Sequence, residues 1–436
     1  MAQQSTLPHS RFGRFAKLGG LATSLAGNLL YEGSKTLLSG NKPVIADLVL
    51  SSKNANKIAE KLSEMRGAAM KVGQLLSMDV GYLLPKEVSE VFSRLRNDAH
   101  QMPMMQVAEV MENNLGSHWQ EHFNRFKFTP IASASIGQVH SAELKDGRQV
   151  AIKLQYPGVK ESIDSDIDNI TMLLNLFKMI PADVDIAPLI EDARLQLHVE
   201  ADYNSEAAFL KEFGSFINND DRLELAEVIE ELSNDAILTT TFLEGEVIDK
   251  LYDKSMEVRQ SVTGTLLELS LREVFQFGIV QTDSNFANYL YSENTGKIQL
   301  LDFGATRRYS ERMRNKFMVL LNACLIDDKQ AILESAYEVG YTCEDDNKHY
   351  QEAIVDLLLT VTMPIRHEGE FDFRHHQLSQ LMMDKLMELR FEQRYTRLPP
   401  TDILFLHRKL GGLYLLLSHL GARLNVNKLV RDTLSL

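Results

Sequence analysis

The segment QTDSNFANYLYSENTGKIQLLDFGATR, residues 281–307, restricts the possible folds more than any other part of this chain. Its two apolar-rich runs, Tyr289–Tyr291 and Lys297–Leu301, are separated by the polar stretch Ser-Glu-Asn-Thr-Gly. This pattern predicts a β-hairpin closed by a short glycine-containing loop. The hairpin would gather at one end two carboxylates and an amide that can ligate metal ions. These side chains belong to Asp283, Asn288 and Asp302.

Other parts of a phosphoryl-transfer site occur elsewhere in the chain. A kinase needs a strand lysine for the nucleotide phosphates, a helical glutamate that holds this lysine, and a catalytic-loop aspartate followed by a metal-binding asparagine. Val150-Ala151-Ile152-Lys153 matches the strand lysine motif. Asp283 and Asn288 have the catalytic-loop spacing, and Asp302 of Asp-Phe-Gly supplies a second metal ligand. In this order and spacing we interpret them as a kinase-like site rather than as ordinary strand and turn residues.

Two features differ from an ordinary protein kinase. The loop expected over the phosphates contains alanine and serine in place of glycine, at Ala132, Ser133, Ala134 and Ser135. Alanine resists the backbone angles that glycine adopts, so this loop would approach phosphates differently, unless it is only a small-residue turn. The catalytic loop, Gln281-Thr282-Asp283, lacks the arginine that pairs with a phosphorylated activation loop, and no Ala-Pro-Glu follows. We therefore expect no platform for protein substrates.

Periodicity predicts helices in the first third of the chain. Between residues 54 and 79 apolar residues recur at steps of four and three, which is typical of one buried helix face. A second helix is expected from Pro85, and a third is expected to end at Gly116.

Strands are expected beyond Phe128, around the turn Lys145-Asp146-Gly147, and again at Ala236–Phe242. Helices are expected from Val159 to about Ile217 and over most of the chain from Ser255. The pattern predicts an α+β protein with a helical N-terminal extension (1–126), a small mixed lobe (127–245) and a helical lobe (246–436).

Composition excludes several classes of function. A formal charge of −14 argues against general nucleic-acid binding, because no positive field would attract phosphates. Cys324 and Cys343 show no paired spacing, so we expect neither disulfide nor zinc, which fits a reducing compartment. No uncharged run reaches the roughly 20 residues that a bilayer span requires. Residues 1–31 lack acidic groups and carry three basic ones, which suits a transit peptide, a membrane-surface helix or a packed helix.

Several motifs together indicate a family. They are Lys71-Val72-Gly73-Gln74 (KxGQ), the alanine-rich loop with Ile136-Gly137-Gln138-Val139-His140, Glu200-Ala201-Asp202-Tyr203 (ExD), and Gln281-Thr282-Asp283. With them the chain resembles, from about Arg11 to Arg423, the UbiB/AarF family of atypical protein-kinase-like proteins associated with ubiquinone (coenzyme Q) biosynthesis. The two ends resemble the branch without C-terminal transmembrane spans. Ser133 departs from a more usual alanine, which leaves the fine nucleotide preference open.

The resemblance implies a two-lobed kinase-like fold whose N-terminal extension lies over the active site, with the KxGQ segment where a peptide would bind. It implies an ATPase or small-molecule kinase more than a protein kinase. Glu206 takes the place of the helical glutamate that pairs with Lys153, and the backbone at Leu243–Gly245 that of the adenine-contacting hinge.

Elementary geometry leaves the roles of the KxGQ and ExD residues open. Lys71 is one residue from Val72 on the apolar stripe, so it projects roughly 100° away, into a cleft or into solvent. Gln74 has the same two alternatives. On a helix Glu200 and Asp202 would point to different faces, so only one is expected to reach metal or Lys71; surface acids are the alternative. Glu206, four residues after Asp202, would share its face.

We therefore expect ATP or ADP with Mg²⁺ (or Mn²⁺) held by Asn288 and Asp302, Lys153 fixed by Glu206, and a nucleophile oriented by Asp283. The expected partners are quinone-precursor lipids or an anionic membrane surface and a ubiquinone-biosynthesis protein complex, with no nucleic acid. The alternatives are a nucleotide-gated lipid-binding scaffold without turnover and an active protein kinase. The expected location is the cytoplasm, peripheral on the inner membrane, or alternatively the mitochondrial matrix.

Overall fold

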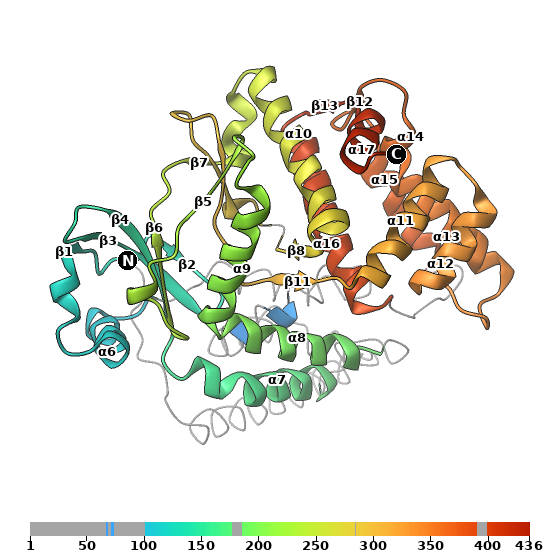
Figure 1. Ribbon diagram of the computed structural model, residues 1–436. Helices are drawn as coiled ribbons and strands as arrows, with labels where there is room; N and C mark the ends of the chain where they lie inside the picture. Colours follow the sequence, from blue (N-terminus) through green and yellow to red (C-terminus); the bar gives the residue numbers. More distant parts are fainter. Residues whose placement is uncertain (1–66, 69–70, 74–100, 177–184, 284, 390–398) are drawn as a thin grey trace, which may run out of the picture. The chain divides into compact units, whose positions relative to one another are not determined.

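The computed structural model describes residues 67–68, 71–73, 101–176, 185–283, 285–389 and 399–436 (Figure 1). The chain divides into two compact units, one of Met1–Ala207 with Glu227–Phe242 and the other of Ala208–Ala226 with Leu243–Leu436. The helices expected over residues 54–79 and from Pro85 lie mostly or wholly outside the described residues, although residues 67–68 and 71–73 are helical. The boundary expected at residue 126 stays a prediction.

The first unit is built on a sheet with strand order β1-β3-β4-β6, to which β2 adds by pairing with β3. The strands are Phe123–Phe126 (β1), Ala132–Ser133 (β2), Gly137–Leu144 (β3), Gln149–Gln155 (β4) and Ile237–Thr241 (β6). β3 and β4 pair antiparallel across the predicted turn, where Gly147 has a φ of 90° that favours glycine. The strands predicted in this region are confirmed.

Side-chain alternation along β4 separates the core from the functional face. Val150, Ile152 and Leu154 are fully buried in the core, where they lie with Trp119. Helix α6 (Met104–Leu115) also packs into this core and ends at the predicted glycine. Because successive strand residues point to opposite faces, Lys153 projects away from this core.

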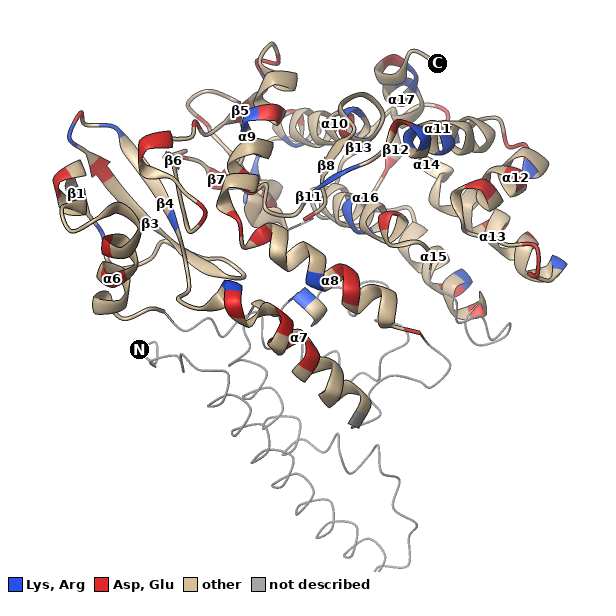
Figure 2. Cartoon of the chain, turned by 60° about the horizontal axis from the view of Figure 1, so that its bottom comes forward, with Lys and Arg blue, Asp and Glu red and all other residues tan. Residues whose placement is uncertain are grey.

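The described residues of the region predicted to be helical up to Ile217 form three helices. They are α7 (Val159–Leu176), α8 (Ala187–Glu200) and α9 (Tyr203–Ile217). Arg194 of α8 forms ion pairs of 3.0 Å with Asp164 and 2.7 Å with Asp168 of α7. Figure 2 shows acidic residues in red along both helices, so these ion pairs offset like charges where the helices pack.

The second unit contains the predicted hairpin. Strands β9 (Tyr289–Tyr291) and β10 (Ile298–Leu300) pair antiparallel, with Leu300 opposite Tyr289. They extend into a four-stranded sheet of order β5-β10-β9-β7, with β5 (Leu223–Leu225) parallel to β10 and β7 (Glu246–Val247) at the other edge. Two further strand pairs are β8 (Ile279–Gln281) with β11 (Thr306–Arg308), and β12 (Phe371–Asp372) with β13 (Arg423–Leu424).

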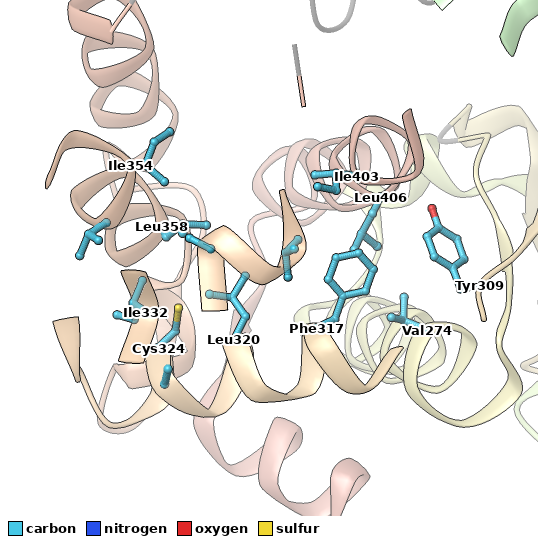
Figure 3. Packing of buried hydrophobic residues seen from close by; sticks show 14 of the residues in the cluster. Val274, Tyr309, Phe317, Leu320, Cys324, Ile332, Ile354, Leu358, Ile403 and Leu406 are labelled. Carbon is cyan, nitrogen blue, oxygen red and sulfur yellow. The ribbon is translucent and has the colours of Figure 1, made fainter. Parts of the chain in front are cut away.

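The rest of the second unit is mainly helical, as predicted. Its helices are α10 (Met256–Arg272), α11 (Glu311–Leu325), α12 (Lys329–Val339), α13 (Lys348–Val361), α14 (Met363–Arg366), α15 (Leu378–Met387), α16 (Thr401–His419) and α17 (Val426–Leu434). Figure 3 shows one of its cores, in which Phe317 and Leu320 of α11 pack with Ile403 and Leu406 of α16. Among the described residues, no helix has the length and apolar character needed to cross a membrane.

Candidate active-site residues

Lys153 is held by a carboxylate in the first unit. Its Nζ donates hydrogen bonds of 2.9 and 2.8 Å to the two carboxylate oxygens of Glu206 in the first turn of α9. The side chain of Lys153 is 14% exposed and that of Glu206 only 4%, so the pair has little competition from water. Nζ also lies 5.2 Å from the ring centre of Tyr203, a contact that the sequence did not indicate.

The alanine-rich loop contains β2 and forms a tight hairpin with β3. Ala132 and Ser133 lie opposite Val139 and Gln138, and the amide of Ala134 donates to the Gly137 carbonyl at 2.9 Å. A Cβ on Gly137 would lie 2.2 Å from the carbonyl oxygen of Leu154, so only glycine fits here. The close approach of β3 to the backbone of β4 therefore requires glycine at position 137, directly after the loop, and not within the loop.

Glu200 connects two sequence motifs with this loop. It forms an ion pair with Lys71, and its second oxygen accepts a hydrogen bond of 3.1 Å from the hydroxyl of Ser135. A Cβ on Gly67, four residues before Lys71, would lie only 2.6 Å from the Ile136 side chain, so this helical segment packs on the loop. Lys71 is buried, which excludes the solvated alternative. Gln74 lies outside the described residues.

Glu200 and Asp202 of the ExD motif do not lie on one helix, so the prediction that placed both on a helix was wrong. Glu200 is the last residue of α8, but Asp202 lies between α8 and α9, so the two carboxylates do not share a helix. Asp202 instead accepts hydrogen bonds from the amide of Asn204 at 3.1 Å and the hydroxyl of Ser205 at 3.3 Å. Local polar residues at a helix start favour such capping over a continuous helix. Asp202 and Glu206 therefore do not share a helix face either.

The loop that leads into β9 in the second unit brings Asp283 and Asn288 together. The side-chain amide of Asn288 donates to Oδ2 of Asp283 at 2.9 Å. The amide of Leu301 donates a hydrogen bond of 3.0 Å to the backbone carbonyl of Asn288. Asp302 is the residue after Leu301, so its backbone lies next to this contact. Oδ1 of Asp302 accepts from the amide of Gly304 at 2.8 Å, which orients the carboxylate. The pairing of β9 with β10 thus holds the residue before Asp302 against Asn288. The shared metal site of the three side chains stays a prediction.

The donor set of this hairpin suits a magnesium ion that is bound together with phosphates. Among the described residues, no group of three or more His, Cys, Asp or Glu side chains is arranged to hold a metal alone. Mg²⁺ commonly takes one or two protein ligands and completes its shell with phosphate oxygens and water. Because the Asn288 amide nitrogen donates to Asp283, its amide oxygen is the atom suited to a cation. Asn288 and Asp302 therefore fit the group expected from the sequence.

Leu243 follows β6 and is the residue at which the chain returns to the second unit. It is half-buried, and Gly245 lies two residues further in the same irregular segment. A Cβ on Gly245 would lie 2.7 Å from the Gln299 side chain and 2.9 Å from the Tyr291 carbonyl. The segment thus needs glycine to lie against the hairpin, and its contact with adenine stays a prediction.

The family model for the ABC1 atypical kinase-like domain matches residues 94–336. This chain belongs to that family. Over 432 residues the ABC1-family chain is 38% identical to the protein named atypical kinase COQ8, mitochondrial, from Saccharomyces cerevisiae, with 99% of this chain and 86% of that protein covered. It is 34% identical to the protein of the same name from Schizosaccharomyces pombe (98% and 70% covered). It is 33% identical to the atypical kinase COQ8B, mitochondrial, from Rattus norvegicus (99% and 82%). The predicted family is confirmed.

A solved structure shows the same fold. It is the complex of Rv3197 with erythromycin from Mycobacterium tuberculosis, with a TM-score of 0.61 and 24% identity over 88% of this chain and 96% of that one. The predicted kinase-like α+β fold is confirmed by this likeness and by the family match.

Sequence reasoning missed two basic residues of this ABC1-family chain. Arg408 and Lys409 lie in α16, and both are buried. Arg408 donates to Oδ1 of Asp283 at 2.6 Å. A signal was present, since two adjacent cations within the apolar run LFLHRKLGGLYLLL require buried partners.

Proposed function

We propose that this ABC1-family chain binds ATP with Mg²⁺ (or Mn²⁺) and hydrolyses it, or transfers its terminal phosphoryl group to a small acceptor. The Lys153–Glu206 ion pair of 2.8 Å carries the proposal. A strand lysine fixed by a helical glutamate is the arrangement with which kinases hold nucleotide phosphates. Lys153 would contact the α- and β-phosphates, and Glu206 would keep its ammonium group in place.

We expect residues of the second unit to supply the remaining roles of the proposed chemistry. Asn288 and Asp302 would hold the metal ion, which when bound neutralises charge on the phosphoryl oxygens. Asp283 would accept a hydrogen bond from the attacking water or hydroxyl group and so orient it. Its hydrogen bond from Asn288 supports this role, because it limits the orientations of the carboxylate.

The contacts of Glu200 favour an ATPase or small-molecule kinase over a protein kinase. Through Glu200 the KxGQ lysine, Lys71, is tied to Ser135 of the loop that we expect over the phosphates. A buried ion pair is costly to break, so this segment is not readily displaced by a peptide. The missing Ala-Pro-Glu sequence points the same way.

Membership of the family supports a role in ubiquinone (coenzyme Q) biosynthesis. We infer that the acceptor or cargo is a quinone-precursor lipid at an anionic membrane surface, beside a ubiquinone-biosynthesis protein complex. The net charge of −14 supports the exclusion of nucleic acid. The names of the relatives place those proteins in mitochondria, which agrees with the matrix alternative to the cytoplasm.

The test is Mg²⁺-dependent ATP hydrolysis by the purified full chain, with and without anionic liposomes that contain a phenol with an isoprenoid tail. Asp302→Asn is run beside the unaltered chain. Turnover that liposomes stimulate and Asp302→Asn abolishes supports the proposal. Asp328→Asn is the matched control, because Asp328 caps α12 and asparagine caps helices equally well.

Two other outcomes would replace the proposal by its alternatives. Nucleotide binding without turnover in either protein, with lipid binding that changes with nucleotide, would indicate a nucleotide-gated scaffold. Transfer of labelled phosphate to a second protein would indicate a protein kinase.

A further inference from the structure

Helix α16 reaches the catalytic loop through a side chain that is far away in sequence. Arg408, 125 positions after Asp283, donates to its Oδ1 at 2.6 Å. The Arg408 side chain is 5% exposed and that of Asp283 is 22% exposed. Asn288 binds the other carboxylate oxygen. The carboxylate is thus held from both sides. Oδ1 also accepts from the backbone amide of Asn285 at 3.4 Å, whereas Oδ2 keeps a second lone pair for a substrate hydrogen bond.

The next residue of α16 connects to the backbone of Asp302. Lys409 Nζ lies 2.8 Å from a carboxylate oxygen of Glu273 and donates to the Tyr289 hydroxyl at 3.1 Å. Tyr289 in turn donates to the side-chain oxygen of Gln281 at 2.6 Å. The Gln281 side-chain nitrogen then donates to the backbone carbonyl of Asp302 at 2.8 Å. This chain of contacts ends at the first residue of Asp-Phe-Gly.

The charge on Lys409 is secured by its surroundings. Burial disfavours an ammonium group, but the Glu273 carboxylate and the Tyr289 hydroxyl together raise the pKa of Lys409 above its usual value. These partners favour the ammonium form of Lys409, although burial also raises the pKa of Glu273.

Packing alone does not account for two buried cations in this helix. Leu404, Phe405, Leu416 and Leu417 are buried and already anchor α16. A buried ion pair is often no more stabilising than apolar residues of the same volume, because desolvation offsets the attraction. What charged, hydrogen-bonded groups add is a fixed position for their partners.

We propose that Arg408 and Lys409 are positioning residues for the proposed phosphoryl chemistry. Arg408 fixes the side chain of Asp283, and Lys409 fixes the backbone of Asp302 through Tyr289 and Gln281. Helix α16 thereby supplies to the catalytic loop the cation that Gln281-Thr282-Asp283 lacks at its centre. The claim that these residues affect catalysis rests on the proposed function and is the catalytic part of the proposal. The claim that they fix Asp283 and Asp302 in place rests on the contacts alone and is the positioning part.

The positioning part is tested without turnover, by hydrogen exchange of residues 281–305 in the nucleotide-free full chain. The amides of Thr282 and Leu301 donate to Ala305 and Asn288, so they report on the loop. Arg408→Gln should accelerate their exchange about tenfold or more, since local opening becomes easier. Arg272→Gln is the matched control, because it breaks a comparable pair with Asp220 (2.6 Å, side chains 16% and 9% exposed). Unchanged exchange in Arg408→Gln would overturn the proposal.

The catalytic part is tested by separating turnover from binding. Arg408→Gln should lower kcat about 100-fold, the cost of a misplaced catalytic group, with the Kd for ATP within about twofold. Arg408→Lys should recover part of the rate because it keeps the charge. In an Asp283→Asn background Arg408→Gln should add no further loss, since Arg408 acts through Asp283. A further loss there would overturn this part. Accelerated exchange in a chain without turnover would refute the proposed function and leave the positioning role standing.

Discussion

Lys71 and Glu200, 129 positions apart, form a buried ion pair in the first unit. The same carboxylate accepts a hydrogen bond from Ser135. One side chain thus joins three segments that the sequence singled out separately: the KxGQ motif, the ExD motif and the alanine-rich loop. Because both charges are removed from water, the pair is sensitive to the loss of either partner.

Lys71→Ala should destabilise the first unit by about 3 kcal/mol, because it leaves Glu200 buried without its cation. The double variant Lys71→Ala/Glu200→Ala should recover part of this unfolding free energy, because it leaves no buried carboxylate without its cation. Urea unfolding followed by tryptophan fluorescence measures it, since the single tryptophan, Trp119, lies buried in this unit's core. Lys160→Ala, which breaks an exposed pair with Asp235, should cost less than about 1 kcal/mol. Equal losses of unfolding free energy in Lys71→Ala and Lys160→Ala would contradict the prediction.

Lys153→Ala should weaken ATP binding at least about tenfold, because a charge-assisted hydrogen bond contributes about 1.5–3 kcal/mol. Glu206→Gln should have a smaller effect in the same direction, since the lysine remains but is less firmly held. Calorimetric titration of the full chain with ATP and Mg²⁺ measures both. Arg148→Ala, whose exposed pair with Asp146 lies at the turn of the same hairpin, serves as control. An unaltered Kd in Lys153→Ala would argue against the assigned phosphate contact.

Asp302→Asn should raise the Mg²⁺ concentration for half-maximal ATP binding about tenfold or more, because an amide is a weaker ligand for this hard cation. Asn288→Ala should act in the same direction. The measurement is ATP affinity as a function of free Mg²⁺, beside the Asp328→Asn control. If the Mg²⁺ dependence of both variants matched that of the unaltered chain, these residues would not be the metal ligands.

The second unit should lose stability in acid through Asp220. Hydrogen bonds from Arg222 and then Arg272 outweigh burial and lower the pKa of Asp220 from 3.8 to about 2. A carboxyl whose pKa is lower in the folded state stabilises it above the unfolded pKa, so this contribution is complete above about pH 4 and is lost towards pH 2. Its size is about 2 kcal/mol.

Chemical unfolding of the unaltered chain and of Asp220→Asn, at pH 5 and pH 2.5, measures this contribution. Far-UV circular dichroism is the probe, because it reports the helices of the second unit, whereas the single tryptophan, Trp119, lies in the first. Asp220→Asn should be less stable at pH 5 and should lose less stability between the two pH values. An equal loss in both proteins would assign the acid sensitivity to other carboxyl groups.

Much of the fold was predictable because its signals are local. The β9–β10 hairpin followed from two apolar runs around a glycine-containing loop, and α6 ended at the predicted glycine. Lys153 could be placed on a strand because Val150-Ala151-Ile152-Lys153 matches the strand lysine motif and lies beside a predicted turn. Period and turn chemistry act over a few residues, so these elements are readable in the chain itself.

The prediction failed at the junction of α8 and α9, where nearby polar side chains and backbone amides decide the local structure. Asp202 was expected to lie with Glu200 on one helix, but its side chain caps the start of the next. The helical pattern was correct on both sides, and only the break between α8 and α9 was missed. Polar side chains that bond to nearby amides compete with the helix over one or two residues, which periodicity does not resolve.

The sequence by itself determined the β9–β10 hairpin, the strands around Lys153, the order of the kinase-like motifs and the family. Tertiary structure decided which charges meet: Lys71 with Glu200, and Arg408 with Asp283. The reason is that local propensity acts through neighbours in the chain, whereas a buried charge takes its partner from any segment that packing brings within hydrogen-bond distance. The sequence indicated Lys71 as a candidate residue but did not indicate Arg408. In the folded chain each of these cations pairs with a carboxylate that is more than 100 positions away.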